Sequence, residues 1–317
     1  MSQMTYSDAG KAALAESMRA DPTIWAVGED LGRGGVFGQY MGMEEEFGPE
    51  RIVSAPISEA AIMGSAVGGA LTGTRPVVEL RFADFALCAV DEMVNQAAKA
   101  RYMFGGQAKV PVVIRQPSGM WRSSAAQHSQ MLEAWYAHIP GMVVVMPSTP
   151  ADNYGLLKAA IKCDDPVVYM EHKDLWSLKG EVPSGHTVEI GKASVVAEGS
   201  DVTVVTWSNT RHVATEAMSA LADVSVELID LRSLWPWDRD CVLTSAAKTG
   251  HLLVAHEAVR DGGFGAEVVA TAVEEIPGLK VARLGAPRIP IPYAPPLEDT
   301  VRVTAENIAA AVTRLAG

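Results

Sequence analysis

The stretch Ile57-Ser58-Glu59-Ala60-Ala61-Ile62-Met63-Gly64 decides how we interpret this chain, because it places one acidic residue at the start of an otherwise uncharged helix. Ser58 suits the N-cap position, where its side-chain oxygen would accept a backbone hydrogen bond. No other ionisable residue follows up to Leu71, so we expect a buried helix, apolar on all sides. Glu59 then has two interpretations: a partner of the helix dipole in the first turn, or a carboxylate aimed at a ligand.

Short apolar strands alternate with amphipathic helices on both sides of this stretch, which is typical of parallel α/β sheets. Glycine and proline interrupt the alternation between residues 174 and 190, which we interpret as a linker. The fold class we predict is α/β, with two doubly wound domains at residues 1–185 and 186–317. The predicted strands span residues 23–28, 52–54, 76–80, 110–115, 142–146 and 166–170, then 201–207, 224–231, 251–256 and 280–284. Helices are predicted at residues 7–19, from 59, and at 91–104, 150–162, 210–222, 238–248, 265–276 and 304–315.

Four residues with polar or aromatic side chains lie in the segments that follow predicted strands: Glu29, Glu59, Phe85 and His128. Ligands of parallel α/β sheets bind beyond the carboxyl ends of the strands. This shared placement is the first indication that the four residues belong to one site.

Composition excludes several classes of function. The net charge is −12 with no basic stripe, which argues against nucleic-acid binding. No apolar run approaches the ~20 residues of a membrane-spanning helix. The three cysteines (Cys88, Cys163 and Cys241) are far apart, which argues against disulfides and structural zinc. With no secretory signal in residues 1–10, we expect a cytoplasmic protein.

Several motifs, occurring in order over nearly the whole chain, resemble one family. These are ISEAAIMG (57–64), RFADF (81–85), KARYMFGG (99–106), AAQHSQ (125–130), DLRSLWPWD (230–238) and HEAVRDGGFGAE (256–267). Together they resemble the β subunit of thiamine-diphosphate-dependent 2-oxo acid dehydrogenases of the pyruvate, branched-chain and acetoin types. The resemblance implies a pyrimidine-binding domain followed by a transketolase C-terminal-like domain.

The resemblance also implies roles for residues around the cofactor. Glu59 would bond the aminopyrimidine ring and promote its imino tautomer, which works best for a desolvated carboxylate with a raised pKa. Phe85 would stack on the same ring, with Phe82 as the alternative in that segment. Glu29 matches an acidic residue near the pyrimidine, and Ile57 would add an apolar or backbone contact.

His128 lies in a loop of small and polar residues, where a histidine that follows a strand is a candidate for proton transfer. The resemblance implies that it lines the active centre, either stabilising the intermediate or assisting reductive acylation of the lipoyl group. His172 and His256 also follow strands, and we interpret both as structural.

The family's diphosphate and magnesium motif, Gly-Asp-Gly with a downstream Asn, belongs to the α subunit and has no counterpart here. The segment Arg260-Asp261-Gly262-Gly263 lies in the wrong place and lacks the asparagine. The resemblance therefore implies an α₂β₂ heterotetramer in which the α subunit holds magnesium. It also implies that the second domain docks the lipoyl-bearing acyltransferase.

Two smaller expectations follow from the same segments. Backbone oxygens near Val112, Cys163 and Asp165 resemble the place where family members bind a structural potassium ion. Arg81 and Asp84 are a candidate supporting ion pair beside Phe85.

The implied reaction is decarboxylation of a 2-oxo acid, or cleavage of acetoin, with transfer of the acyl group to lipoamide. The motifs do not agree on one substrate, and residues 120–124, which include Trp121, fit none of the three types. Two other functions stay open. One is a split transketolase-like enzyme moving two-carbon units, against which the dehydrogenase-type motifs argue. The other is a non-catalytic docking subunit, against which the retention of Glu59, Phe85 and His128 argues.

Overall fold

A computed structural model describes residues 2–317, which form two compact units. The first unit runs to Ser118 and resumes over Trp135–Ile190, while the second contains Gly119–Ala134 and Gly191–Gly317. The long segment of the second unit begins at Gly191. The sequence predicted the boundary between the two domains near residue 185. The grouping of Gly119–Ala134 with the second unit has no signal in the alternation of strands and helices, because this segment is mostly a loop.

The first unit is built on a parallel sheet whose strands run in the order β6-β7-β5-β4-β2-β3. The chain moves from β2 to β3 on one side and then to β4 on the other, so the strand order reverses between β2 and β4. A crevice outside the carboxyl ends of two such strands is the usual ligand position in this class of sheet. The strands are β2 (Ile24–Glu29), β3 (Ile52–Ala55), β4 (Arg75–Glu79), β5 (Val113–Ser118), β6 (Val143–Val145) and β7 (Val167–His172).

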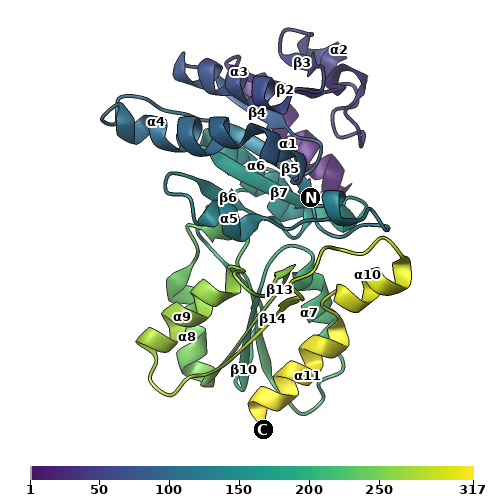
Figure 1. Ribbon diagram of the computed structural model, residues 1–317, viewed down its shortest axis with the longest axis vertical. Coiled ribbons are helices and arrows are strands. Elements are labelled where there is room, and N and C mark those ends of the chain that lie inside the picture. The colour runs from purple at the N-terminus through teal and green to yellow at the C-terminus, as the bar shows by residue number, and fades with distance from the viewer. Residues whose placement is uncertain (1) are drawn as a thin grey trace. The chain divides into compact units, whose positions relative to one another are not determined.

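Helices cover this sheet, and α1 and α6 pack against each other and share its apolar core (Figure 1). Thr149 caps α6 by accepting a hydrogen bond from the Asp152 N–H, and Pro150 occupies the first turn, as predicted. The helix predicted at 91–104 is a π-helical turn, Glu92–Ala97, followed by a short α4. The α-helices in this part are α1 (Tyr6–Ala20), α2 (Met43–Phe47), α3 (Glu59–Leu71), α4 (Ala98–Met103), α5 (Glu133–Ala137) and α6 (Pro150–Lys162).

The second unit has a sheet in the order β14-β13-β10-β11-β9, parallel except for β9. In Figure 1, α8 and α9 lie on one face of this sheet, and α7 and α11 lie on the other. The strands are β9 (Ser194–Ala197), β10 (Val202–Thr206), β11 (Val226–Asp230), β12 (Ser233–Trp235), β13 (His251–Val259) and β14 (Lys280–Ala286). The helices are α7 (Thr210–Met218), α8 (Arg239–Thr249), α9 (Gly265–Glu275), α10 (Pro295–Val301) and α11 (Ala305–Ala316).

These two mostly parallel sheets confirm the predicted α/β class. Two segments differ from the prediction. The stretch interpreted as a linker contains β8 (Lys179–Val182), which pairs antiparallel with β1 (Ser2–Thr5). The proline-rich run after residue 287 enters α10 at Pro295, because proline is tolerated in the first turn of a helix.

Candidate active site

Charged side chains meet at the point where the strand order of the first unit reverses. Glu29 is the last residue of β2, Glu59 is the first residue of α3 directly after β3, and Arg81 follows β4. The Arg81 guanidinium, expected to pair with Asp84, lies 3.6 Å from Glu29 Oε2 and 3.6 Å from Asp30 Oδ2. We call Glu29, Asp30, Glu59 and Arg81 the strand-end cluster.

Glu29 has the strongest perturbation in this cluster. Its side chain is 9% exposed, and burial raises the pKa of its carboxyl. Arg81 opposes this rise, whereas the negative charges of Glu59 and Asp30 add to it. The negative charge of Glu59 thus acts on the Glu29 carboxyl, whereas the placement of both acids at one pyrimidine ring stays a prediction.

Helix α3 begins at Glu59 as expected, but two details of the prediction were wrong. Ser58 stands at the N-cap position without capping the helix, because its hydroxyl donates to the Pro56 carbonyl at 2.9 Å. The helix is not buried on all sides, and one face of small residues is exposed: Ala60, Ala61, Gly64, Ser65 and Gly68. Ile57, just before the helix, is 74% exposed. The apolar composition of this helix therefore does not mean that all of its faces belong to the core of this chain.

Phe85 belongs to a group of aromatic rings in the same unit. Its half-buried ring meets Phe82 edge to face, with 5.3 Å between centroids, and Phe82 meets Phe37 in the same way at 5.7 Å. The Lys173 ammonium lies 4.8 Å from the centre of the Phe82 ring. Phe82 thus has aromatic neighbours on two sides and a cation over its face. The stacking role of Phe85, with Phe82 as the alternative, stays a prediction.

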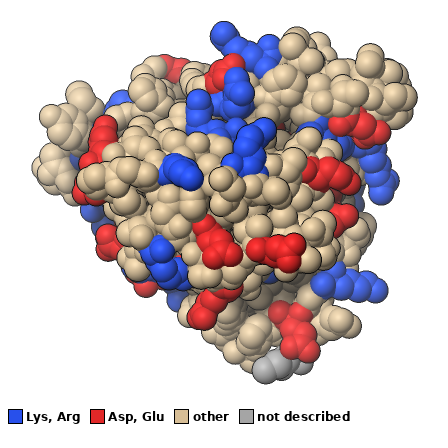
Figure 2. All heavy atoms as spheres, turned by 90° about the horizontal axis from the view of Figure 1, so that it is seen from below, with Lys and Arg blue, Asp and Glu red and all other residues tan. Residues whose placement is uncertain are grey.

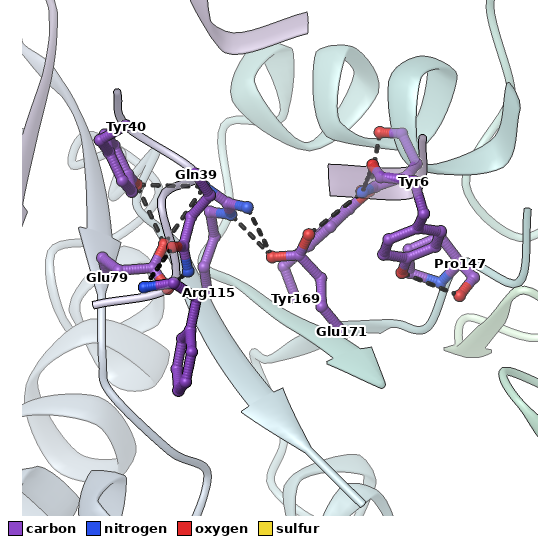
Figure 3. Close-up of polar contacts among 10 residues, drawn as sticks. Tyr6, Gln39, Tyr40, Glu79, Arg115, Pro147, Tyr169 and Glu171 are labelled. Carbon is purple, nitrogen blue, oxygen red and sulfur yellow. Dashed lines mark hydrogen bonds and ion pairs between the residues drawn. The ribbon is translucent and has the colours of Figure 1, made fainter. Parts of the chain in front are cut away.

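Figure 3 shows a buried polar network in the first unit that was not predicted from the sequence. Arg115 on β5 is 1% exposed; its Nη2 lies 2.7 Å from Glu171 Oε2, and its Nη1 lies 3.2 Å from Glu79 Oε2. The Tyr40 hydroxyl donates to Glu79 Oε2 at 3.0 Å. We call this the buried arginine network: Gln39, Tyr40, Glu79, Arg115, Asn153 and Glu171.

Glu79, the last residue of β4, belongs to the buried arginine network and also lines a small void together with Glu29 and Arg81 of the strand-end cluster. Burial raises its pKa to about 7, although Arg115 lowers it and Glu171 raises it further. A small void lined by Glu29, Gln39, Glu79 and Arg81, together with Val36 and Phe37, separates Glu79 from the strand-end cluster. Gln39 and Tyr40 belong to the loop after β2, so their hydrogen bonds to Glu79 also fix that loop beside the crevice.

His128 lies in the second unit, on a one-turn 3₁₀ helix, Ala126–His128, and its side chain is half-buried. Arg122, Ser123 and Ala125 just before it have positive φ angles of 48°, 57° and 63°. Non-glycine residues in that region are strained, and such strain concentrates at functional loops. The loop therefore supports a functional role for His128, whereas its placement with Glu59 and Phe85 stays a prediction.

A cavity of about 480 Å³ lies in the second unit beside this loop. Gln127 and Ser129, on either side of His128, line it together with Met120, Glu257 and Arg288. Glu257 Oε1 accepts the Met120 N–H at 2.6 Å, which ties the start of the loop to β13. Most of the remaining lining is apolar: Ala126, Met131, Leu132, Ala258, Val259, Ala286, Ile289, Pro290 and Ile291, with Gln130.

The two other strand-end histidines are buried and bonded to nearby backbone. His172 Nδ1 accepts the Asp174 N–H at 3.1 Å, and His256 Nδ1 lies 3.1 Å from the Ala258 carbonyl oxygen. The His256 ring also stacks on Trp207, and burial lowers its pKa to about 4. Both arrangements agree with the structural interpretation of these histidines.

Several carbonyl oxygens near the predicted potassium site accept hydrogen bonds from within the chain. The Arg75 guanidinium donates to the Cys163 carbonyl at 3.1 Å and to that of Ile161 at 3.0 Å. The Val112 carbonyl accepts the Val167 N–H at 2.9 Å, and the Asp164 carbonyl accepts the Val110 N–H at 3.1 Å. A carbonyl oxygen that accepts one N–H keeps a second lone pair, so these bonds do not test the potassium site, which stays a prediction.

Three further properties of the described residues concern metal-binding groups, membrane-spanning helices and the distribution of surface charge. Among residues 2–317 there is no group of three histidine, cysteine, aspartate or glutamate side chains able to hold a metal ion. No helix within that range is long and apolar enough to cross a membrane. On the face in Figure 2, several basic side chains gather in the upper middle of the view, and acidic side chains lie at the sides and below among larger uncharged areas.

Comparisons with known proteins agree on one family. The profile of the transketolase pyrimidine-binding domain matches residues 2–177, and that of the transketolase C-terminal domain matches residues 191–308. The chain is 41% identical to the 2-oxoisovalerate dehydrogenase subunit beta of Bacillus subtilis, covering 100% of this chain and 99% of the relative. It is 41% identical to the acetoin:2,6-dichlorophenolindophenol oxidoreductase subunit beta of Cupriavidus necator, covering 95% and 94%.

A third relative is the pyruvate dehydrogenase E1 component subunit beta-2, mitochondrial, of Oryza sativa, at 39% identity over 98% of this chain and 86% of the relative. Among solved structures, a split-gene transketolase described as an inactive β4 tetramer matches with a TM-score of 0.80 at 24% identity, covering 98% of both chains. That structural match shows the fold alone.

Proposed function

The chain belongs to the transketolase-like β subunits of thiamine-diphosphate-dependent 2-oxo acid and acetoin dehydrogenases, and from this premise we propose its reaction. Together with an α subunit, it decarboxylates a 2-oxo acid or cleaves acetoin, and it transfers the acyl unit to the lipoamide of an acyltransferase. The observation that carries the proposal is the meeting of Glu29, Glu59 and Arg81 at the strand-order reversal. Its motifs and free cysteines favour a cytoplasmic location.

The residues of the first unit suit the pyrimidine half of the cofactor. Bound thiamine diphosphate supplies a carbanion that cleaves the bond next to a carbonyl. Glu59 holds the pyrimidine ring by a hydrogen bond, Phe85 stacks on it, and Ile57 covers its edge. Glu29 supplies a second carboxyl, whose pKa is raised by burial and by the negative charge of Glu59. His128 holds or moves a proton near the acyl group.

The other half of the cofactor needs another chain. No diphosphate motif is present, and the described residues contain no acidic or histidine cluster for magnesium. Large apolar side chains also stay exposed in the first unit: Ile57 at 74%, Leu87 at 43%, Tyr102 at 86%, Met103 at 73% and Phe104 at 57%. Exposed apolar patches of this kind mark protein interfaces. We therefore assign magnesium to an α subunit, in an α₂β₂ assembly whose second domains dock the acyltransferase.

Calorimetric titration of thiamine diphosphate with magnesium tests the interface. The chain alone should show negligible binding, and the complex with its α subunit should bind. Tight binding to the chain alone would contradict a shared site.

Substitution of Glu59 tests the chemistry. Glu59→Gln in the α–β complex should lower turnover by roughly 10²- to 10⁴-fold, because the carboxylate that promotes the imino tautomer is lost. Glu50→Gln, which changes an exposed acid in the same unit, is the matched control and should keep wild-type turnover. Wild-type turnover in Glu59→Gln, with unchanged thermal unfolding of both variants, would exclude this role.

Three classes of substrate are candidates: branched-chain 2-oxo acids, acetoin and pyruvate. Relatives acting on 2-oxoisovalerate, acetoin and pyruvate are similarly distant from this chain, at 41%, 41% and 39% identity. A screen of pyruvate, branched-chain 2-oxo acids and acetoin with an artificial electron acceptor, using the purified complex, identifies the class. Turnover of sugar phosphates without an electron acceptor would instead favour the split-transketolase alternative.

A further inference from the structure

The contacts of Arg81 leave one of its three nitrogens without a partner. Its Nη1 lies 3.6 Å from Glu29 Oε2 and its Nη2 lies 3.6 Å from Asp30 Oδ2, whereas a direct charge-assisted hydrogen bond measures roughly 2.7–2.9 Å. Within residues 2–317, the Arg81 Nε is a buried donor with no hydrogen-bond partner. Because a buried N–H without a partner is costly, this geometry calls for an acceptor beside Nε.

The void that Arg81 lines has the size and the polarity for one water molecule. Its volume is about 10 Å³, and Glu29, Gln39 and Glu79 line it together with Arg81. A buried water needs roughly that much space and roughly two to four polar partners. The void therefore brings an unpartnered donor and two carboxyl groups to the same small space.

Glu79 has an acceptor to offer on this side. Its Oε2 accepts the Tyr40 hydroxyl at 3.0 Å and lies 3.2 Å from Arg115 Nη1 (Figure 3). Its Oε1 accepts the Gln39 amide at 3.4 Å, which is long for such a bond. Each carboxylate oxygen has about two acceptor sites, so Oε1 has room for a second donor.

We propose that one water molecule occupies this void, accepts the Arg81 Nε–H, donates to Glu79 and Glu29, and thereby keeps Arg81 from closing on Glu29. The guanidinium lowers the pKa of Glu29, whereas Glu59 and Asp30 raise it. An Arg81 that moved from 3.6 Å into direct hydrogen bonding would lower that pKa further. Glu79 is therefore a positioning residue, which acts on Glu29 through the water and Arg81. This inference rests on the proposed function only for the use it gives to Glu29.

Crystal structures of the α–β complex without thiamine diphosphate test the water directly. Wild-type crystals should show one water within about 3.2 Å of both Arg81 Nε and a Glu79 oxygen. Glu79→Leu removes the acceptor at similar side-chain volume, so the water should be lost and Arg81 should close to within about 3 Å of Glu29. Glu50→Leu changes an exposed acid of the same unit, and this matched control should leave the water and Arg81 in place.

Isotope-edited infrared titration of the same cofactor-free complex gives a second measurement. In Glu79→Leu the pKa of Glu29 should lie at least about 1 pH unit below the wild-type value, and in Glu50→Leu it should equal that value. A purely structural role of Glu79 would lower stability without moving this pKa. Neither measurement uses turnover, so their failure is distinct from failure of the proposed reaction.

Three outcomes would overturn the proposal. The first is a wild-type crystal, which needs no variant to fold, whose void holds no water. The second is an Arg81 Nε bonded directly to Glu29, to Asp30 or to the α subunit in that crystal. The third is a folded Glu79→Leu complex in which the pKa of Glu29 is unchanged or raised.

Discussion

The strand-end cluster and the buried arginine network use the same chemical groups, an arginine between carboxylates, at the ends of neighbouring strands. In the network, Arg115 lies 2.7 Å from Glu171 and 3.2 Å from Glu79, and all three side chains are at most 7% exposed. In the cluster, Arg81 is 31% exposed and lies 3.6 Å from both Glu29 and Asp30. One arrangement is tight and dry, and the other is loose and open to solvent.

This difference indicates different roles. Buried charges are tolerated only when they are paired and hydrogen-bonded, so the network is a fixed support under the crevice. Loosely paired carboxylates change protonation at low cost and can reorient toward a ligand. We infer that the network positions the loop of Gln39 and Tyr40, and that the cluster handles protons.

Removal of the network arginine should have the largest effect. Arg115→Met leaves Glu79 and Glu171 as buried carboxylates without their cation, which should lower the free energy of unfolding by about 3–5 kcal/mol. Arg19→Met is the control, because Arg19 is 55% exposed and its ion pair with Glu46 should be worth at most about 1 kcal/mol. Denaturant unfolding of the purified complex measures both. A loss below about 1 kcal/mol in Arg115→Met would contradict the supporting role.

The pH dependence of stability should show a smaller effect, through Glu79. Its folded pKa of about 7 lies above the ordinary value of 4.5, so the folded state holds a proton that the unfolded state releases between these values. Stability from this group is therefore fully present below pH 4.5 and is lost as the pH rises through 7. The full shift corresponds to about 3 kcal/mol at most.

Glu79→Gln isolates this contribution, because glutamine does not ionise and its carbonyl oxygen can still accept the Tyr40 hydroxyl hydrogen bond. The stability of Glu79→Gln relative to wild type should rise between pH 5 and pH 8, as measured by unfolding temperatures at matched ionic strength. A difference that is constant over this range would show that Glu79 does not titrate there.

The fold was predictable because buried parallel strands have an unusual, near-continuous apolar composition, as in β4 and β7. The short elements β1, β8 and β9 were missed, because few-residue strands at sheet edges have weak periodicity. The exposed face of α3 was mispredicted for another reason. Small apolar residues suit either a core or a surface covered by another chain, and one sequence does not separate the two.

The candidate site was predictable where residue type and position coincide. Glu29 ends β2 and Glu59 begins α3 after β3, and the charge of Glu59 acts on the Glu29 carboxyl. The network was missed because it depends on pairing across strands that are distant in sequence. One signal was present: Glu79, Arg115 and Glu171 are charged residues at or near the ends of otherwise apolar strands, where an unpaired charge would be costly. Arg75 had no comparable signal, because its partners are mostly backbone carbonyls.

The smallest effects should come from the cluster itself, where two substitutions should move the pKa of Glu29 in opposite directions. Arg81→Gln removes the positive charge that lowers this pKa, so the pKa should rise; Glu59→Gln removes a negative charge that raises it, so the pKa should fall. Isotope-edited infrared titration of the carboxyl groups measures both, and the band lost in Glu29→Gln identifies the residue. Because these pairs are long and partly exposed, neither substitution should change the free energy of unfolding by more than about 1 kcal/mol. Shifts in the same direction, or a loss of stability as large as that of Arg115→Met, would show that the cluster is a second structural network rather than a site for protons.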